Sequence, residues 1–119
     1  MNQSNIFPKS SRVVKSRDFT RILKAGGVAA GASIVVFAVG NGRNDCRLGV
    51  TIPKKTGNAV LRNRWKRLIR EAFRTQRGLM PDGYDLIVRP KRGGVAEFAE
   101  MHRSLPILAS KAARRYESR

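Results

Sequence analysis

The sequence predicts an α+β fold in which a small β-sheet packs against helices, in the element order αββαβαα. Short runs rich in β-branched and aromatic residues indicate the strands, and a long segment with helical spacing of its apolar residues separates the second run from the third. The length of 119 residues and the hydrophobic content of 41% suit one modest core. We therefore expect a single domain over residues 1–119. The polar composition of residues 1–11 and of the last few residues is typical of flexible ends.

Helix signals occur near both ends of the chain. The Ser-Arg-Asp sequence at 16–18 combines an N-cap with an acid in the first turn, and two glycines at 26–27 end the segment, which predicts a short first helix. Two further helices are predicted near the C-terminus. The first covers 95–102, and the second begins with Ser104 as its N-cap and has apolar residues at helical spacing.

Three segments have the composition of strands. Residues 34–39 and 48–52 are β-branched and apolar, and the turn-rich segment 40–45 between them predicts an antiparallel hairpin with a long loop. A third strand is predicted over 84–89, where Pro90 closes the run. These strands form the expected sheet.

The charge balance indicates a polyanionic partner. Lys and Arg total 25 against 8 Asp and Glu, a formal net charge of +17, and residues 54–77 alone contribute +8. Because apolar residues are interleaved with these bases, the segment is unlike a disordered basic tail. A structured positive surface of this kind favours nucleic acid as the partner.

Other classes of site and location are disfavoured. One cysteine, Cys46, and one histidine, His102, are too few for a disulfide, a Cys/His zinc site or a Cys/His catalytic set, and we expect structural roles for both. Asp82 and Asp85 are close in sequence but have no further ligands nearby, so we expect them to cap or turn the chain rather than to bind a metal. The N-terminus lacks a secretory signal, and the longest continuous apolar run has strand length. We expect a cytoplasmic protein with no membrane contact, no obligate protein partner and no organic cofactor.

Residues 59–77 form an amphipathic helix with one basic face. Advancing about 100° per residue places six of its basic residues and one asparagine within a sector of about 140°, and its apolar residues on the opposite side. Arg64 falls outside this sector, at about 200°. The only acid, Glu71, falls outside the sector, so the helix does not neutralise this face with acids four residues away. Trp65 lies on the apolar side and is expected in the core. The residues of the basic sector are Arg62, Asn63, Lys66, Arg67, Arg70, Arg74 and Arg77.

A family resemblance becomes specific at this helix. The segment 54–60, Lys-Lys-Thr-Gly-Asn-Ala-Val, followed by Leu-Arg-Asn-Arg-Trp-Lys-Arg-Leu-Ile-Arg-Glu-Ala-Phe-Arg at 61–74, resembles the signature of the bacterial ribonuclease P protein subunit. The Arg62-Asn63-Arg64 triplet is its hallmark. The first helix, the strands and the C-terminal helices match the family in order and spacing, so the resemblance covers most of the chain.

The resemblance implies a ribosomal-protein-like fold with a left-handed crossover, and a role as the protein cofactor of a ribozyme. The RNA subunit removes the 5′ leader from precursor tRNA by hydrolysis that depends on Mg²⁺, which the RNA mainly holds, and no residue of this chain is expected to be catalytic or to bind metal. The implied partners are the ribonuclease P RNA and precursor tRNA. The implied RNA-binding residues are Lys54, Lys55, Arg62, Asn63, Arg64, Lys66, Arg67, Arg70 and Arg74.

The family also holds the single-stranded leader in a cleft between the first helix and the sheet. Phe19 and Phe37 match the aromatic positions expected there, since bases stack on aromatic side chains in a positive groove. Leu23 occupies a position that is often aromatic in the family, and it keeps an apolar wall without a stacking surface. Pro53 stands where a small polar residue can occur. The alternative for both phenylalanines is ordinary core packing.

Three other functions were weighed against this interpretation. A structural RNA-binding protein of ribosomal type would share the charge and the fold without a role in cleavage. A nuclease acting without RNA would need a general base or clustered carboxylates, which eight scattered acids do not provide. A nucleoid-type DNA-binding protein would bind duplex DNA and structured RNA equally well.

Overall fold

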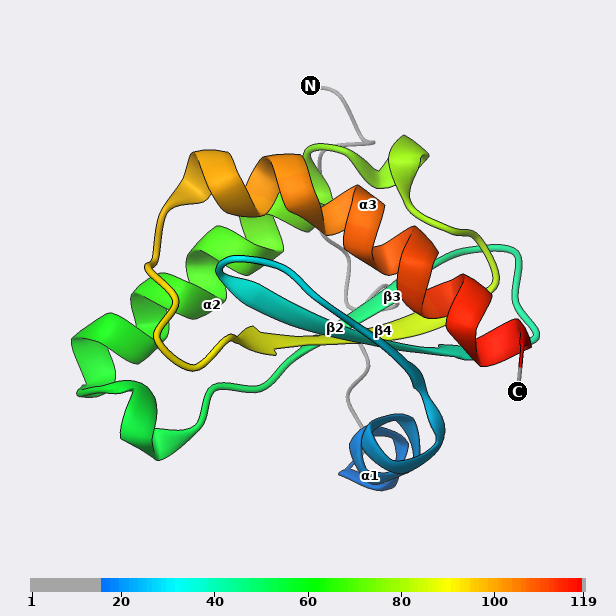
Figure 1. The fold of residues 1–119 in the computed structure, drawn as a ribbon, viewed down its shortest axis with the longest axis horizontal. Helices are drawn as coiled ribbons and strands as arrows, with labels where there is room; N and C mark the ends of the chain where they lie inside the picture. The colour runs from blue at the N-terminus through cyan, green and yellow to red at the C-terminus, as the bar shows by residue number, and fades with distance from the viewer. Residues whose placement is uncertain (1–15, 119) are drawn as a thin grey trace.

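The computed structural model describes residues 16–118 and shows a four-stranded sheet with helices on both faces (Figure 1). Residues 1–11 and 119, for which the sequence predicts flexibility, lie outside the described residues. The strands are β1 (Gly27–Ala30), β2 (Ile34–Gly40), β3 (Arg47–Val50) and β4 (Tyr84–Pro90), and the helices are α1 (Ser16–Ala25), α2 (Ala59–Arg74) and α3 (Phe98–Glu117). Short 3₁₀ turns cover Lys54–Thr56 and Arg77–Leu79. The predicted α+β class is confirmed.

The sheet has the strand order β1-β2-β4-β3. β2 pairs antiparallel with β1 and β4, whereas β3 pairs in parallel with β4. The predicted hairpin between 34–39 and 48–52 is therefore wrong, because β4 lies between these strands and pairs with β2 along its full length. β3, α2 and β4 form a crossover connection, and its left-handed sense stays an expectation from the resemblance.

Two helix and strand predictions need correction. β1 was missed because its four residues, Gly-Val-Ala-Ala, have weak strand propensity. Its formation depends on long-range packing: a Cβ at Gly27 would lie 2.1 Å from the carbonyl oxygen of Ala112, so only glycine lets β1 approach α3 this closely. The predicted break before Ser104 is also wrong, since α3 continues through Pro106. Its buried face packs along β1 and β2 and outweighs the hydrogen bond that proline removes.

The sheet separates two apolar clusters. The larger one lies between the sheet and the helices α2 and α3, and includes Val36, Leu86, Trp65 and Leu105. The smaller one lies under α1 and consists of Ile22, Phe37, Val39 and Ile87, with Phe19, Val35 and Tyr116 packed against it. Alternate residues of β2 and β4 thus face opposite clusters, as the two-residue period of a strand requires. Within residues 16–118, no helix is long and apolar enough to cross a membrane.

Candidate nucleic-acid interface

The apolar side of α2 anchors the helix to the sheet. The side chain of Asn58 caps the helix by accepting a hydrogen bond of 2.9 Å from the backbone N–H of Leu61. Trp65, Ile69, Ala72 and Phe73 are buried, and Trp65 is only 2% exposed, so its predicted place in the core is confirmed. The helix ends at Arg74, three residues earlier than predicted, and Arg77 lies in the following turn with its guanidinium carbon 6.0 Å from the centre of the Phe73 ring.

The opposite side of α2 is a basic surface, as the spacing predicts. The helix contains six cationic side chains and one carboxylate, a net charge of +5. Among the residues that the structure describes, Lys66, Arg67 and Arg70 form no ion pair. A shallow groove of about 380 Å³ runs along this face. It is lined by Asn63, Lys66, Arg67, Arg70, Glu71 and Arg74.

Three arginines of α2 have more specific surroundings. Glu71 forms an ion pair with Arg74, which lowers the pKa of the Glu71 carboxyl, so the helix neutralises one of its bases at a spacing of three residues. The Arg64 guanidinium donates to the carbonyl oxygen of Ala96 at 3.4 Å and links α2 to the segment before α3. The Nε of Arg62 is buried and has no hydrogen-bond partner among the described residues.

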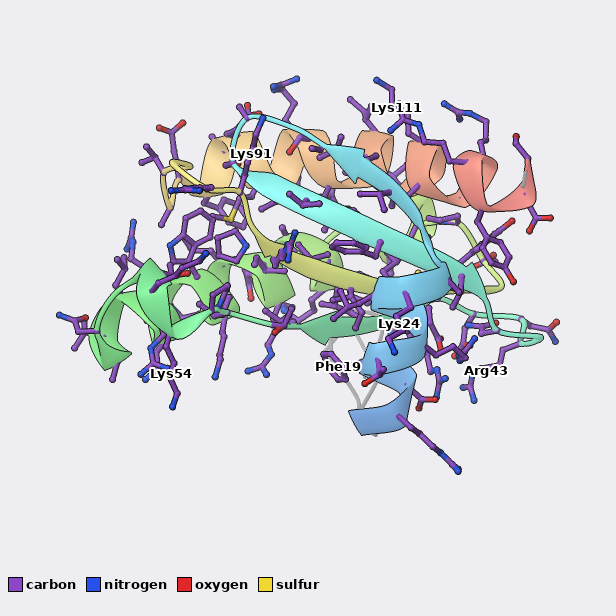
Figure 2. The ribbon with its side chains drawn as sticks, turned by 60° about the horizontal axis from the view of Figure 1, so that its bottom comes forward. Phe19, Lys24, Arg43, Lys54, Lys91 and Lys111 are labelled. Carbon is purple, nitrogen blue, oxygen red and sulfur yellow. The ribbon has the colours of Figure 1, made fainter. Side chains whose placement is uncertain are left out.

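The predicted lysine pair extends the basic surface. Lys54 and Lys55 are exposed in the 3₁₀ turn that precedes α2, and Figure 2 shows Lys54 beside the start of that helix. A groove of about 820 Å³ lies between this turn, α2 and residues 89–96. Its cationic lining is Lys55, Arg89, Lys91 and Arg92, and its apolar lining includes Pro53, Leu61 and Val95.

Sequence reasoning missed the contribution of residues 89–92 to this groove. Arg89 lies two residues after Ile87 on the same strand and so shares its sheet face, and the pairing of β4 with β2 places Phe37 on that face as well. The Arg89 guanidinium carbon lies 5.1 Å from the centre of the Phe37 ring. Arg89 thus connects the groove with the face covered by α1.

The structure brings the three predicted leader-binding residues together around α1. Phe37 is only 7% exposed and belongs to the smaller cluster, so it is a core side chain whose outer surface is covered by Arg89 rather than an open stacking platform. Phe19 is half-buried and points toward β3 (Figure 2), where a Cβ at Gly49 would lie 2.9 Å from the end of its ring. Leu23 is 38% exposed. The accessible apolar surface therefore comes from α1.

Asp85, Cys46 and His102 all make contacts inside the fold rather than at the basic surface. Asp85 is neither a cap nor a turn residue: it is fully buried in β4 and accepts two hydrogen bonds from Arg47. Cys46 is buried, and the loss of solvent raises the pKa of its thiol. The backbone carbonyl of His102 accepts a hydrogen bond from Gln76, and its ring packs against Phe98. Within residues 17–118, no three His, Cys, Asp or Glu side chains lie close enough together to hold a metal ion.

Comparison with known proteins identifies the family. A family model described as Ribonuclease P matches residues 7–113. The chain belongs to the ribonuclease P protein family. A relative from Thermotoga petrophila, a ribonuclease P protein component, is 36% identical over 95 residues, which cover 80% of this chain and 81% of that protein. The corresponding protein of Streptococcus pneumoniae is 36% identical over 98 residues, covering 82% of this chain and 80% of that protein.

Solved structures show the same relationship. The ribonuclease P protein of Thermotoga maritima, in complex with 1-(4-fluorophenyl)-2-thiourea, superposes with a TM-score of 0.77 at 32% identity and covers 84% of this chain and 98% of that one. The Staphylococcus aureus protein gives a TM-score of 0.74 at 34% identity, with coverage of 86% and 94%. The chain is therefore the protein subunit of an endoribonuclease, ribonuclease P, and its partner is the ribonuclease P RNA. The alternative of a ribosomal-type structural protein is not favoured.

Proposed function

We propose that the RNA subunit performs the hydrolysis and that this chain assists by binding both the catalytic RNA and the precursor tRNA. The observation that best supports RNA binding is the outer face of α2, where Lys66, Arg67 and Arg70 line a groove and form no ion pair with any residue that the structure describes. Arginine forks donate paired hydrogen bonds to phosphates, so this face suits an RNA backbone. The proposed RNA contacts are Lys54, Lys55, Arg62, Asn63, Arg64, Lys66, Arg67, Arg70 and Arg74.

The 5′ leader is proposed to lie across the opposite part of the molecule, on α1 and the adjoining sheet. Phe19 and Leu23 supply accessible apolar surface there, and Phe37 supports them from below. Arg89 places a positive charge directly on this face. Mature tRNA lacks the leader, so contacts here add affinity for the precursor alone.

Magnesium ions are proposed to be held mainly by the RNA. Divalent magnesium prefers oxygen ligands and is commonly bound through carboxylates together with phosphates of the substrate. Because its substrate is precursor tRNA, the complex is proposed to act in the cytoplasm.

Cleavage of a precursor tRNA at low magnesium tests the proposal. Three reactions are compared: ribonuclease P RNA alone, this protein alone, and the two together. We expect efficient cleavage only in the combined reaction, which would show that the protein assists the RNA and does not cleave by itself. Cleavage by the protein alone would contradict the proposal, and tight RNA binding without stimulation would support a purely structural role.

Variants test the proposed division between the two faces. Leu23→Ala removes exposed apolar surface and should lower the preference for precursor over mature tRNA while leaving RNA-subunit affinity unchanged. Arg62→Ala should mainly weaken assembly with the RNA subunit. Phe37→Ala should behave like Leu23→Ala, with an added loss of stability because its side chain is buried. Equal effects of the Leu23 and Arg62 variants in both assays would refute the division.

A further inference from the structure

Asp85 is a buried carboxylate whose charge is balanced within the sheet. Arg47 donates from Nε to Oδ1 at 2.8 Å and from Nη2 to Oδ2 at 2.6 Å, and the Nδ2 of Asn41 donates to Oδ1 at 2.9 Å. A bidentate arginine and an amide satisfy a buried carboxylate well. Arg47 and Asn41 therefore compensate the charge of Asp85 without a residue from α1.

A second arginine nevertheless approaches the same carboxylate from α1. The Nη2 of Arg21 lies 3.7 Å from Oδ2 of Asp85, and the Arg21 side chain is 47% exposed. Since Arg47 already compensates the charge, the pair between Arg21 and Asp85 matters for the placement of α1 rather than for the stability of the sheet.

Within the part of the chain that the structure describes, helix α1 is attached to the sheet largely through apolar contacts. It packs against β2 and β4, with Ile22 fully buried and Phe19 half-buried against the sheet. Its ten residues are too few to form a stable helix in isolation. Ile22 holds the middle of the helix, Phe19 rests over Gly49 on β3, and Arg21 reaches toward Asp85 on β4. The ion pair thus gives α1 a directional polar contact with β4, whereas its apolar contacts are non-directional.

We propose that Asp85 acts through Arg21 as a positioning residue that fixes α1, and with it Phe19 and Leu23, over the sheet face that meets the leader. This inference rests on the proposed function for its consequence in substrate binding. Its structural part, the fixing of α1, is independent of that function. The two parts are therefore tested by different measurements.

Amide hydrogen exchange of the whole chain tests the structural part. Arg21→Ala should speed exchange severalfold in residues 17–25 and leave α2 and α3 unchanged, while Arg21→Lys should restore much of the protection. Arg43→Ala is the matched control, because it removes the same charge near the same end of the sheet, where Arg43 pairs with Asp45. Exchange in residues 17–25 that stays at the wild-type rate, or that rises equally in the control or throughout the chain, would overturn the inference.

Affinity for precursor and mature tRNA, measured in the complex with the RNA subunit, tests the consequence. Pairs of this exposure contribute about a 1.5-fold to fivefold effect, so Arg21→Ala should reduce the precursor preference by an amount in that range. In an Asp85→Asn background the same substitution should have no further effect, because its partner is gone. A direct contact between Arg21 and a leader phosphate would instead persist in that background and refute the positioning role. If the wild-type complex itself shows no precursor preference, the proposed function fails, whatever exchange shows for α1.

Discussion

Replacing Arg67 and Arg70 together by alanine tests the proposal that the basic surface of α2 binds RNA. Both side chains are exposed and form no ion pair among the residues that the structure describes, so their removal should leave the fold intact. Each phosphate that is neutralised contributes about 0.7 to 0.9 to the slope of log affinity against log salt concentration. A surface that contacts about six phosphates gives a slope near −4 to −5.

The size of the expected change follows from that slope. Between about 50 and 200 mM salt, wild-type affinity for the RNA subunit should fall by about 500-fold, and that of the double variant by only about 60-fold. Filter binding or fluorescence anisotropy over this salt range measures both slopes. Lys111→Ala with Arg114→Ala on α3 is the matched control, since it removes the same charge from exposed positions on another helix. A double variant with the wild-type slope, or a control with the same reduction, would refute the assignment of RNA binding to α2.

Three further changes probe the packing. Gly49→Ala would place a Cβ 2.7 Å from Ile87 Cδ1 and 2.9 Å from the Phe19 ring, so it should displace that ring and weaken precursor binding without weakening RNA-subunit binding. Trp65→Ala should lower the free energy of unfolding by about 3 to 5 kcal/mol in urea denaturation, because the side chain is buried. The Cys46 thiol should react slowly with a disulfide reagent at pH 8, because burial raises its pKa and blocks access, and should react rapidly once urea unfolds the chain.

Each of these has a contrary outcome. Unchanged precursor affinity in the Gly49 variant would show that the placement of Phe19 is unimportant for the leader. A loss below about 1 kcal/mol for the Trp65 variant would contradict its role in the core, since buried aromatic truncations cost several times more. Equal thiol reactivity of the folded and unfolded chains would contradict the burial of Cys46.

Local sequence patterns predicted the helices and strands of this protein better than they predicted which strands pair. The helical spacing of α2 correctly placed Trp65 in the core and the basic residues on the outer side of the helix. This works because the buried residues of an amphipathic helix recur with a period of about 3.6 residues. The pairing of β3 with β4 instead joins Leu48 to Leu86, and nothing in the turn-rich loop after β2 specifies that choice. β1 escaped notice because its stability comes from its neighbours rather than from its own four residues.

The part of the candidate site on α2 could be predicted from the sequence, but the part that depends on strand pairing could not. The residues of α2 are close in sequence, whereas Arg89 and Phe37 meet only because β2 and β4 pair. The expectation that Asp85 caps or turns the chain was wrong, because it lies buried inside β4. An acid inside a run of buried strand residues requires a cation nearby, and here that cation is Arg47.

Because the sheet separates the two apolar clusters, each side of the molecule can be engineered largely independently of the other. β2 and β4 present Val36 and Leu86 to one cluster, and Phe37 and Ile87 to the other. Substitutions on opposite sides share few partners, so their effects on stability should be close to additive. The proposed leader surface over α1 can therefore be redesigned while the packing that holds α2, the proposed RNA-binding helix, is left untouched.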